Sequence, residues 1–203
     1  MITKVVAVVG SYRKDGTIDS AVEAVLAGAR EKGAETVAFH LREKHVEFCT
    51  NCRQCVQAPG AERVKCVQQD DMEPMLQAID EADAVVLASP INFYNVTAIF
   101  RRFMERTLGY GYWPWSKPTP GWRNRNPRKK AVLVASSAAP RIFIPLATGA
   151  AKALKVTART LGAKPVGRLW IGLVGGEPHY QLSDRERARA MRMGRKLVKS
   201  IAA

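Results

Sequence analysis

Four cysteines lie within one short segment, and their spacing is typical of metal ligands. They follow the pattern C-x2-C-x2-C-x10-C, at Cys49, Cys52, Cys55 and Cys66. Four thiolates suit a [4Fe–4S] cluster, although a tetrahedral zinc site takes the same ligands. Reactive or disulfide-forming thiols, such as Cys52 with Cys55, are the third interpretation. The cysteine-rich loop, at about residues 42–69, is therefore predicted to be a metal-binding or redox segment.

A second set of chemistry-bearing side chains lies in a loop near the N-terminus. It follows the apolar run of residues 5–9 and offers hydroxyls, one guanidinium and two glycines: Gly10, Ser11, Arg13, Gly16 and Thr17. An amphipathic helix is expected next, and its N–H groups and dipole point at the loop, a geometry that binds phosphate. The glycines do not form a G-x-G-x-x-G fingerprint, so a single phosphate fits better than a pyrophosphate. An ordinary β–α turn is the alternative interpretation.

Two further loops follow apolar runs of the same kind. Aromatic and amide side chains occupy residues 91–95, after the run 84–88, where they are suited to line a planar ligand. A turn with partly buried aromatics is the alternative there. Small residues follow the run 130–135: Ser136, Ser137 and Ala138. Because the carboxyl ends of parallel strands meet at one sheet edge, the three loops predict one pocket for a phosphate and a planar ring.

The elements that must position these loops alternate along the chain. Apolar runs predict strands at about residues 5–9, 84–88 and 130–135, and a further strand is expected at 165–173. Residues 35–41 alternate between apolar and polar and predict a short strand at the sheet edge. Amphipathic stretches predict helices at about residues 18–29, 70–83, 96–108, 146–161 and from 184 onward. Capping boxes are expected at two helix starts, Asp70 with Glu73 and Ser183 with Glu186. The predicted fold class is α/β, a doubly wound five-stranded parallel sheet with the flavodoxin-like strand order 2-1-3-4-5.

The length of 203 residues suits a single flavodoxin-like domain over residues 1–203. One segment interrupts the alternation, an aromatic and basic insertion at about residues 109–130 that holds three of the four tryptophans. A loop of this length without periodicity is usually functional or part of an interface. A subunit contact is preferred for it over an active-site lid, because aromatic side chains anchor interfaces well.

The chain carries a formal net charge of +14. Basic residues gather in the insertion and in the last helix, and such a surface attracts polyanions. A solvated cationic face is the preferred interpretation, because no helix-turn-helix, zinc-finger or RRM pattern supports nucleic-acid binding. No apolar run approaches the roughly 20 residues of a membrane span, and the N-terminus lacks a signal-peptide layout. A cytoplasmic protein with no membrane partner is therefore expected.

Three stretches resemble motifs of the NADPH-dependent FMN reductases. Residues 10–17, GSYRKDGT, resemble their G-S-x-R-x-x-G-[NT] loop. Residues 89–98, SPINFYNVTA, resemble their S-P-[VI]-Y-F-x-[NS]-[VM]-[ST]-[AG] loop, and residues 101–106, RRFMER, align with K-x-F-x-D-R. The cysteine run is most similar to that of the iron–sulfur flavoprotein branch, in which the last gap is usually shorter than here.

The resemblance implies an FMN site at these loops. The phosphate is expected at the first loop, among Ser11, Arg13, Gly16, Thr17 and Ile18. The isoalloxazine ring and ribityl chain are expected at the second, along Pro90, Ile91, Asn92, Phe93, Tyr94 and Asn95. The pyrimidine side of the ring is expected near Ser136, Ser137 and Ala138. Two positions depart from the family pattern, since Ile18 replaces a hydroxyl and Asn92 replaces a tyrosine for which Phe93 or Tyr94 can compensate.

The function implied by the resemblance is an FMN-binding oxidoreductase of the flavin- or quinone-reductase type, with NAD(P)H as the electron donor. An iron–sulfur flavoprotein electron carrier that accepts electrons from ferredoxin is the alternative. A basic nucleic-acid-binding protein on a flavodoxin scaffold is the alternative of another class. No catalytic acid or base is assigned, because the flavin carries the reaction. A homo-oligomer, either dimer or tetramer, and a redox protein partner are also expected.

Overall fold

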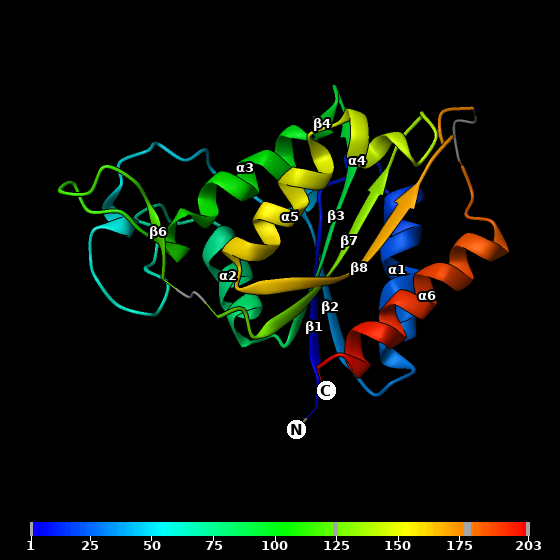
Figure 1. The fold of residues 1–203 in the computed structure, drawn as a ribbon, viewed down its shortest axis with the longest axis horizontal. Helices are drawn as coiled ribbons and strands as arrows, with labels where there is room; N and C mark the ends of the chain where they lie inside the picture. Colours follow the sequence, from blue (N-terminus) through cyan, green and yellow to red (C-terminus); the bar gives the residue numbers. More distant parts are fainter. Residues whose placement is uncertain (1, 124–125, 177–179, 202–203) are drawn as a thin grey trace.

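The computed structural model describes residues 2–123, 126–176 and 180–201. Its centre is a sheet of five parallel strands in the order β2-β1-β3-β7-β8 (Figure 1). The strands are β1 (Lys4–Val9), β2 (Glu35–His40), β3 (Ala84–Asn92), β7 (Lys129–Ser136) and β8 (Ala163–Ile171). This is the predicted order 2-1-3-4-5, so the doubly wound α/β fold is confirmed.

Helices cover both faces of the sheet. On one face lie α1 (Thr17–Arg30) and α6 (Asp184–Lys199), and on the other lie α2 (Met72–Glu81), α3 (Ala98–Arg106) and α5 (Ala150–Thr160). Successive residues of β1 alternate between the two layers, since Val6 and Val8 pack with α2, α3 and α5 whereas Val5 and Val9 pack with α1 and α6. Strands buried on both faces have continuous apolar sequences, which is why the runs were recognisable.

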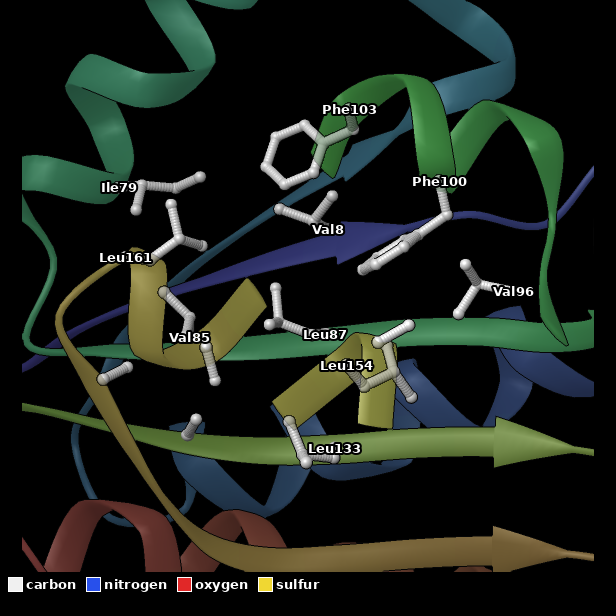
Figure 2. Packing of buried hydrophobic residues seen from close by; sticks show 14 of the residues in the cluster. Val8, Ile79, Val85, Leu87, Val96, Phe100, Phe103, Leu133, Leu154 and Leu161 are labelled. Carbon is white, nitrogen blue, oxygen red and sulfur yellow. The ribbon is translucent and has the colours of Figure 1, made fainter. Parts of the chain in front are cut away.

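One of the two cores is built around aromatic side chains of α3 (Figure 2). Phe100 and Phe103 are fully buried, and their ring centroids lie 6.0 Å apart. They pack with Val8 of β1 and Leu87 of β3. This packing fixes α3 on the two central strands of the sheet, so the N-terminus of α3 stays close to the loops that follow those strands.

The helices on the opposite face approach each other very closely. A Cβ atom added to Gly28 of α1 would lie 2.1 Å from the carbonyl oxygen of Met191 in α6. One added to Gly194 of α6 would lie 1.9 Å from the carbonyl oxygen of Val25 in α1. Real Cβ contacts are never this short, so the two glycines are what allow the helix backbones to touch.

The helix expected over residues 146–161 is wrong in its first part. The structure has a short helix α4 (Phe143–Ala147) that ends before α5 begins. Leu146, the first residue of the predicted helix, is 79% exposed. The chain breaks because Gly149 packs against the loop after β3: its N–H donates to the Tyr94 carbonyl (2.8 Å), and a Cβ there would lie 2.7 Å from Nδ2 of Asn95.

The capping box expected at the start of α2 is also wrong, whereas the one at α6 is confirmed. Asp70 accepts a hydrogen bond from the Met72 N–H, but its carboxylate mainly binds the guanidinium of Arg106. Glu73 forms a bidentate pair with Arg63 instead of turning back to the helix start. Two long-range ion pairs thus replace one local cap, because a guanidinium satisfies a carboxylate more fully than a single N–H.

The insertion packs against the cysteine-rich loop, at the end of the molecule opposite α6 (Figure 1). It contains η3 (Thr107–Tyr110), β5 (Gly111–Tyr112) and β6 (Gly121–Trp122), and the cysteine-rich loop contains η1 (Leu41–Glu43) and η2 (Gln54–Val56). The Trp113 N–H donates to the Val56 carbonyl (2.9 Å), and the Val64 N–H donates to the Gly109 carbonyl (3.3 Å). Residues 124–125 of the insertion lie outside the described part of the chain. In the described ranges, no helix combines the length and apolar character needed to cross a membrane.

Candidate functional site

A cavity of about 1020 Å³ opens at the carboxyl edge of the sheet. The first loop contributes residues 11–18, the second contributes Pro90, Ile91 and Asn92, and the third contributes Ser136, Ser137 and Ala138. The three predicted loops therefore meet in one place. All of the residues expected around a phosphate line this cavity, as do those expected at the pyrimidine side of a flavin: Ser11, Arg13, Gly16, Thr17, Ile18, Ser136, Ser137 and Ala138.

The first loop is held in shape by its own hydroxyl and by α3. Ser11 is buried, and its Oγ accepts from the Arg13 N–H at 3.2 Å. Thr97, the N-cap of α3, donates from Oγ1 to the Gly10 carbonyl at 2.6 Å. A Cβ on Gly10 would lie 2.7 Å from the Cβ of Phe100, so a larger residue would push the loop away from α3. The loop is therefore rigidly joined to the core.

The start of α1 faces this loop without a capping side chain. The N-cap residue is Gly16, which has no side chain that could accept a hydrogen bond from the first turn. The N-terminal N–H groups of a helix carry a partial positive charge. Together with the Thr17 hydroxyl and the Arg13 side chain, they form a set of donors that suits a phosphomonoester. The residues present therefore fit the phosphate of FMN.

The second loop is a tight hairpin, and part of it lies outside the cavity. β3 continues to Asn92 and pairs in antiparallel fashion with β4 (Asn95–Val96). Phe93 (φ +47°) and Tyr94 (φ +63°) form the turn, and their side chains are 101% and 73% exposed. Bulky residues rarely adopt this left-handed conformation, so the hairpin stores backbone strain. Phe93, Tyr94 and Asn95 do not line the cavity, so their contact with a flavin ring stays a prediction.

A fourth loop, after β8, also lines the cavity, and sequence reasoning missed it. It contributes Val174, Gly175, Gly176 and Tyr180. The signal was present, because two glycines follow the last strand and that strand ends at the same sheet edge. Tyr180 is held by α6, since its hydroxyl lies 3.0 and 3.1 Å from the two carboxylate oxygens of Glu186.

The four cysteines form a second candidate site, and none of them lines the cavity. Burial, together with the nearby thiols of Cys66, Cys49 and Cys52, raises the pKa of the Cys55 thiol to about 11. All four are free cysteines. In the described part of the chain, however, no three His, Cys, Asp or Glu side chains converge closely enough to hold a metal ion. The fold thus gathers the four thiols without closing a coordination site.

Two buried donors in or beside the cysteine-rich loop lack a hydrogen-bond partner within the described part of the chain. They are Nε of Arg53 and Nε of Arg106, and one buried acceptor, Oε1 of Gln68, is also unpaired there. Arg53 lies between Cys52 and Cys55 in the chain, and the thiol of Cys66 interacts with Arg106. Buried N–H groups are rarely left unpaired, and an anionic group rich in sulfur acceptors is one partner that would satisfy them. The residues therefore fit a thiolate-ligated cluster in charge and donor type.

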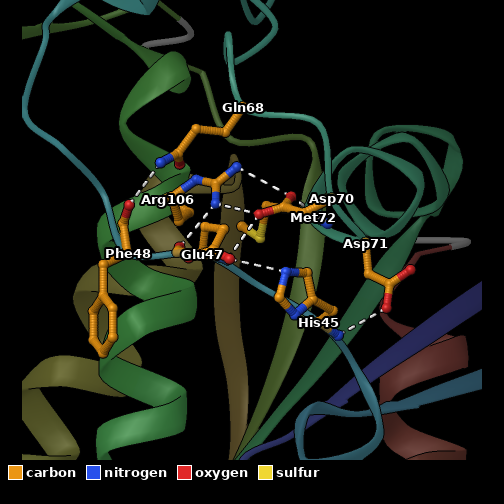
Figure 3. Close-up of polar contacts among 8 residues, drawn as sticks. All are labelled: His45, Glu47, Phe48, Gln68, Asp70, Asp71, Met72 and Arg106. Atoms are coloured by element: carbon orange, nitrogen blue, oxygen red, sulfur yellow. Dashed lines mark hydrogen bonds and ion pairs between the residues drawn. The ribbon is translucent and has the colours of Figure 1, made fainter.

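A buried ion pair fastens both ends of the cysteine-rich loop to α3 (Figure 3). Arg106 Nη1 lies 2.5 Å from Oδ2 of Asp70, and the side chains are 1% and 0% exposed. The same nitrogen donates to the Glu47 carbonyl at 2.8 Å, before the first cysteine, whereas Asp70 follows the last cysteine. Burial would raise the pKa of Asp70, but hydrogen bonds from Arg106 and from two backbone N–H groups hold it below its usual value.

The tryptophans of the insertion hold the middle of the same loop. The guanidinium carbon of Arg53 lies 3.7 Å from the ring centroid of Trp113 and 4.1 Å from that of Trp115. Arg53 Nη2 also donates to the Trp113 carbonyl at 2.7 Å. Arg53 adopts a left-handed backbone conformation (φ +61°), and this stacking is what stabilises it. The described residues of the insertion support the cysteine-rich loop and do not line the cavity.

Similar proteins of known family bear on both candidate sites, the cavity and the cysteine-rich loop. Residues 3–173 match the family model of the NADPH-dependent FMN reductases. An iron–sulfur flavoprotein of Archaeoglobus fulgidus is 39% identical over 114 residues, which cover 56% of this chain and 50% of that protein. An iron–sulfur flavoprotein of Methanocaldococcus jannaschii is 33% identical over 104 residues, 51% of each chain. The chain thus spans about half the length of these curated relatives.

Solved structures share the fold at low sequence identity. An NAD(P)H:quinone oxidoreductase from Methanothermobacter marburgensis aligns with a TM-score of 0.73 at 20% identity, over 97% of this chain and 100% of that chain. An archaeal flavodoxin aligns with a TM-score of 0.58 at 15% identity, over 99% and 100%. Such identities show the fold alone. The family match, in contrast, spans the five strands of the sheet and the first three loops of the cavity, and by it this chain belongs to the NADPH-dependent FMN reductase family.

Proposed function

We propose that this protein is an FMN-binding oxidoreductase that takes electrons from NAD(P)H. The observation that carries the proposal is the meeting of four loops in one cavity, with phosphate-type donors at one side and small residues at the other. Pockets at this edge of a doubly wound sheet are the usual place for a nucleotide-like ligand. Family membership supports FMN as that ligand.

The residues of the chain have binding and orienting roles in this proposal. Ser11, Thr17 and the N-terminal N–H groups of α1 hold the phosphate, and Arg13 adds positive charge. Pro90 and Asn92 lie where the ring is expected, and the third loop lies where its pyrimidine edge is expected. When bound, FMN supplies the hydride- and electron-transfer chemistry, and no side chain is assigned as an acid or base.

We further propose that the four cysteines ligate a [4Fe–4S] cluster. The gathered thiols and the unpaired donors of Arg53 and Arg106 support it, and the names of the curated relatives point the same way. A protein with both groups can also act as an electron carrier that accepts electrons from ferredoxin, which is the second candidate function. The cytoplasmic location and a homo-oligomeric state stay predictions.

A visible absorption spectrum of protein purified without oxygen tests these proposals. We expect two flavin bands above a broad brownish background, with bleaching of the flavin bands by NADPH or NADH. Flavin bands without the background would reject the cluster and leave thiols or zinc. Flavin that neither nicotinamide bleaches, but that reduced ferredoxin does, would favour the electron carrier. A colourless protein that also refuses added FMN would contradict the proposed function.

A single substitution tests the phosphate position. In Thr17→Val, loss of a hydrogen bond to a charged group is expected to raise the Kd for FMN by about 10-fold or more. The matched control is Thr160→Val at the end of α5, where the hydroxyl donates to the Val156 carbonyl outside the cavity. Fluorescence titration with FMN measures both. Equal affinities in the two variants would place the phosphate elsewhere.

A further inference from the structure

A charged pair, Asp19 of α1 and Arg42 of η1, contacts the first loop from outside the main cavity. Neither residue lines that cavity, whereas both line a second, smaller cavity of about 530 Å³. Lys14 and Asp15 of the first loop line both cavities. The loop that is expected to bind the phosphate therefore has the main cavity on one side and this pair on another.

The pair is largely buried, and its two groups meet through two contacts. Nη1 of Arg42 lies 3.1 Å from Oδ1 of Asp19, and Nη2 of Arg42 lies 2.9 Å from Oδ2. The side chains of Arg42 and Asp19 are 13% and 10% exposed. Arg42 also pairs with Glu43, but that carboxylate is 56% exposed. Paired hydrogen bonds between a guanidinium and a carboxylate fix the orientation of both groups, so the pair is a rigid support.

Each member of the pair also binds the backbone of the first loop. Nη1 of Arg42 donates to the Arg13 carbonyl at 3.2 Å, and Oδ2 of Asp19 accepts from the Asp15 N–H at 3.0 Å. Asp15 has a left-handed backbone conformation (φ +55°), which is uncommon outside glycine and persists only where its surroundings impose it. The Ser11 hydroxyl holds the Arg13 N–H of the same stretch. The loop backbone is thus fixed both from within and by the charged pair.

We propose that Asp19 and Arg42 are positioning residues for the phosphate site. They hold the first loop in the shape that directs its donors at the phosphate, and they do not contact the phosphate themselves. Binding groups act well only when neighbouring residues fix their geometry. The inference rests on the proposed function, because the phosphate of FMN is the group that this loop is proposed to bind. Since Arg42 begins the cysteine-rich loop, part of the support for the flavin site comes from that loop.

A purely electrostatic role for the pair predicts a different result. The carboxylate of Asp19 repels an anionic phosphate, so its removal would strengthen FMN binding if charge alone mattered. If Asp19 positions the loop, its removal weakens FMN binding instead. Arg42→Lys separates the two roles for the other member, because lysine keeps the charge but cannot form the paired contacts of a guanidinium. The sign of the effect therefore distinguishes positioning from charge.

The test compares FMN with riboflavin, which lacks the phosphate, by fluorescence titration. In Asp19→Ala and in Arg42→Ala, the preference for FMN over riboflavin is expected to fall about 10-fold or more, as for a lost hydrogen bond to a charged group. Arg42→Lys should lose a similar part of the preference. The double variant of Asp19→Ala with Arg42→Ala should lose no more than about the larger single loss, because the two residues act as one unit.

The matched controls are Glu23→Ala and Arg30→Ala. These residues form another ion pair on α1, both are exposed, and neither lines the main cavity. Each control removes the same charge as its counterpart and should keep the preference for FMN. Circular dichroism shows that every variant is folded.

Amide hydrogen exchange of the flavin-free protein gives a readout that does not depend on FMN. Exchange in residues 11–17 is expected to become faster in Asp19→Ala and Arg42→Ala and to stay unchanged in the controls. Unchanged exchange would overturn the proposal, and so would a preference for FMN that is kept in both variants or increased in Asp19→Ala. Equal weakening of FMN and riboflavin would also overturn it. If the unmodified protein binds the two flavins equally, the phosphate assignment of the proposed function fails, and the exchange measurement still decides whether the pair holds the loop.

Discussion

At the level of single residues, the ion pair of Asp70 with Arg106 has the largest expected effect on stability. Both side chains are almost completely buried, and the pair joins the two ends of the cysteine-rich loop to α3. Removing one member leaves a buried charge without a partner, which costs about 3–5 kcal/mol. The pair therefore decides whether the four cysteines are held near one another.

The first prediction is that Asp70→Asn lowers the free energy of unfolding at pH 7 by about 3–5 kcal/mol. Because the pKa of Asp70 is lowered in the folded state, its contribution is complete above the unfolded value of about 3.9 and is lost as the pH falls through the folded value. The difference between the two proteins should therefore shrink below about pH 4. Urea unfolding from pH 7 down to about pH 2.5 measures it.

The control for this prediction is Asp184→Asn, an exposed carboxylate in the first turn of α6. Its effect is expected to stay below about 1 kcal/mol at pH 7, as for a charge near a helix N-terminus. A stability of Asp70→Asn equal to that of the control would show that the buried pair does not hold the loop.

At the level of elements, the contact between α1 and α6 depends on two glycines. Helix propensity alone would favour alanine at either position by about 1 kcal/mol. The backbone of the partner helix occupies the space that a methyl group would need, however. At Gly28 and Gly194, helix propensity favours alanine, whereas packing requires glycine. The short distances mean that the packing requirement is the larger effect.

We expect Gly194→Ala to destabilise the fold by about 1–3 kcal/mol, against the direction of helix propensity, because the added methyl forces the helices apart. Its Cβ would lie 1.9 Å from the Val25 carbonyl oxygen and 2.7 Å from the Ala29 nitrogen. Thermal and urea unfolding measure the change. Lys196→Ala, exposed on the same helix, is the control and should stay within about 0.5 kcal/mol. A stabilised Gly194→Ala protein would mean that the helices are farther apart than described.

At the level of the whole molecule, the net charge of +14 is an unfavourable term for the compact state. Few acids balance it, since 32 lysines and arginines stand against 18 aspartates and glutamates. Much of this repulsion acts between exposed groups, and salt screens such interactions over about 10 Å at 0.1 M. Added salt is therefore expected to stabilise this protein, whereas it destabilises a protein that is held together by surface ion pairs.

We predict that the Tm rises as NaCl increases from about 10 mM to about 200 mM, because screening reduces the self-repulsion. Circular dichroism at several salt concentrations measures the rise. The double variant Lys196→Glu and Lys199→Glu changes the net charge from +14 to +10, four units less, and should show a smaller rise. A Tm that falls with salt in both proteins would mean that ion pairs outweigh the net repulsion.

Strand order and the position of the main cavity were predictable from the sequence. The central strands β1, β3 and β7 contain continuous apolar runs, and each is followed by a loop whose composition differs from its surroundings. Because parallel strands joined by helices obey one connection rule, the alternation predicted a doubly wound parallel sheet, for which the flavodoxin-like order 2-1-3-4-5 was adopted. The meeting of the first three loops was then a geometric consequence. The capping box of Ser183 and Glu186 was equally predictable, because it depends on residues only three positions apart.

Only the tertiary structure shows which residues far apart in the chain pair with one another. Asp70 binds Arg106, which is 36 positions away, and the local D-x-x-E spacing gave no sign of that pairing. Tyr180 lines the cavity, where its hydroxyl contacts Glu186 of α6. Phe93 lies in the left-handed turn of the hairpin after β3 and is fully exposed. Periodicity and caps follow from neighbouring residues, so the sequence encodes them directly. Ion pairs, close helix contacts and the gathering of the cysteines depend on which surfaces the packed core brings together, and only the folded chain determines that.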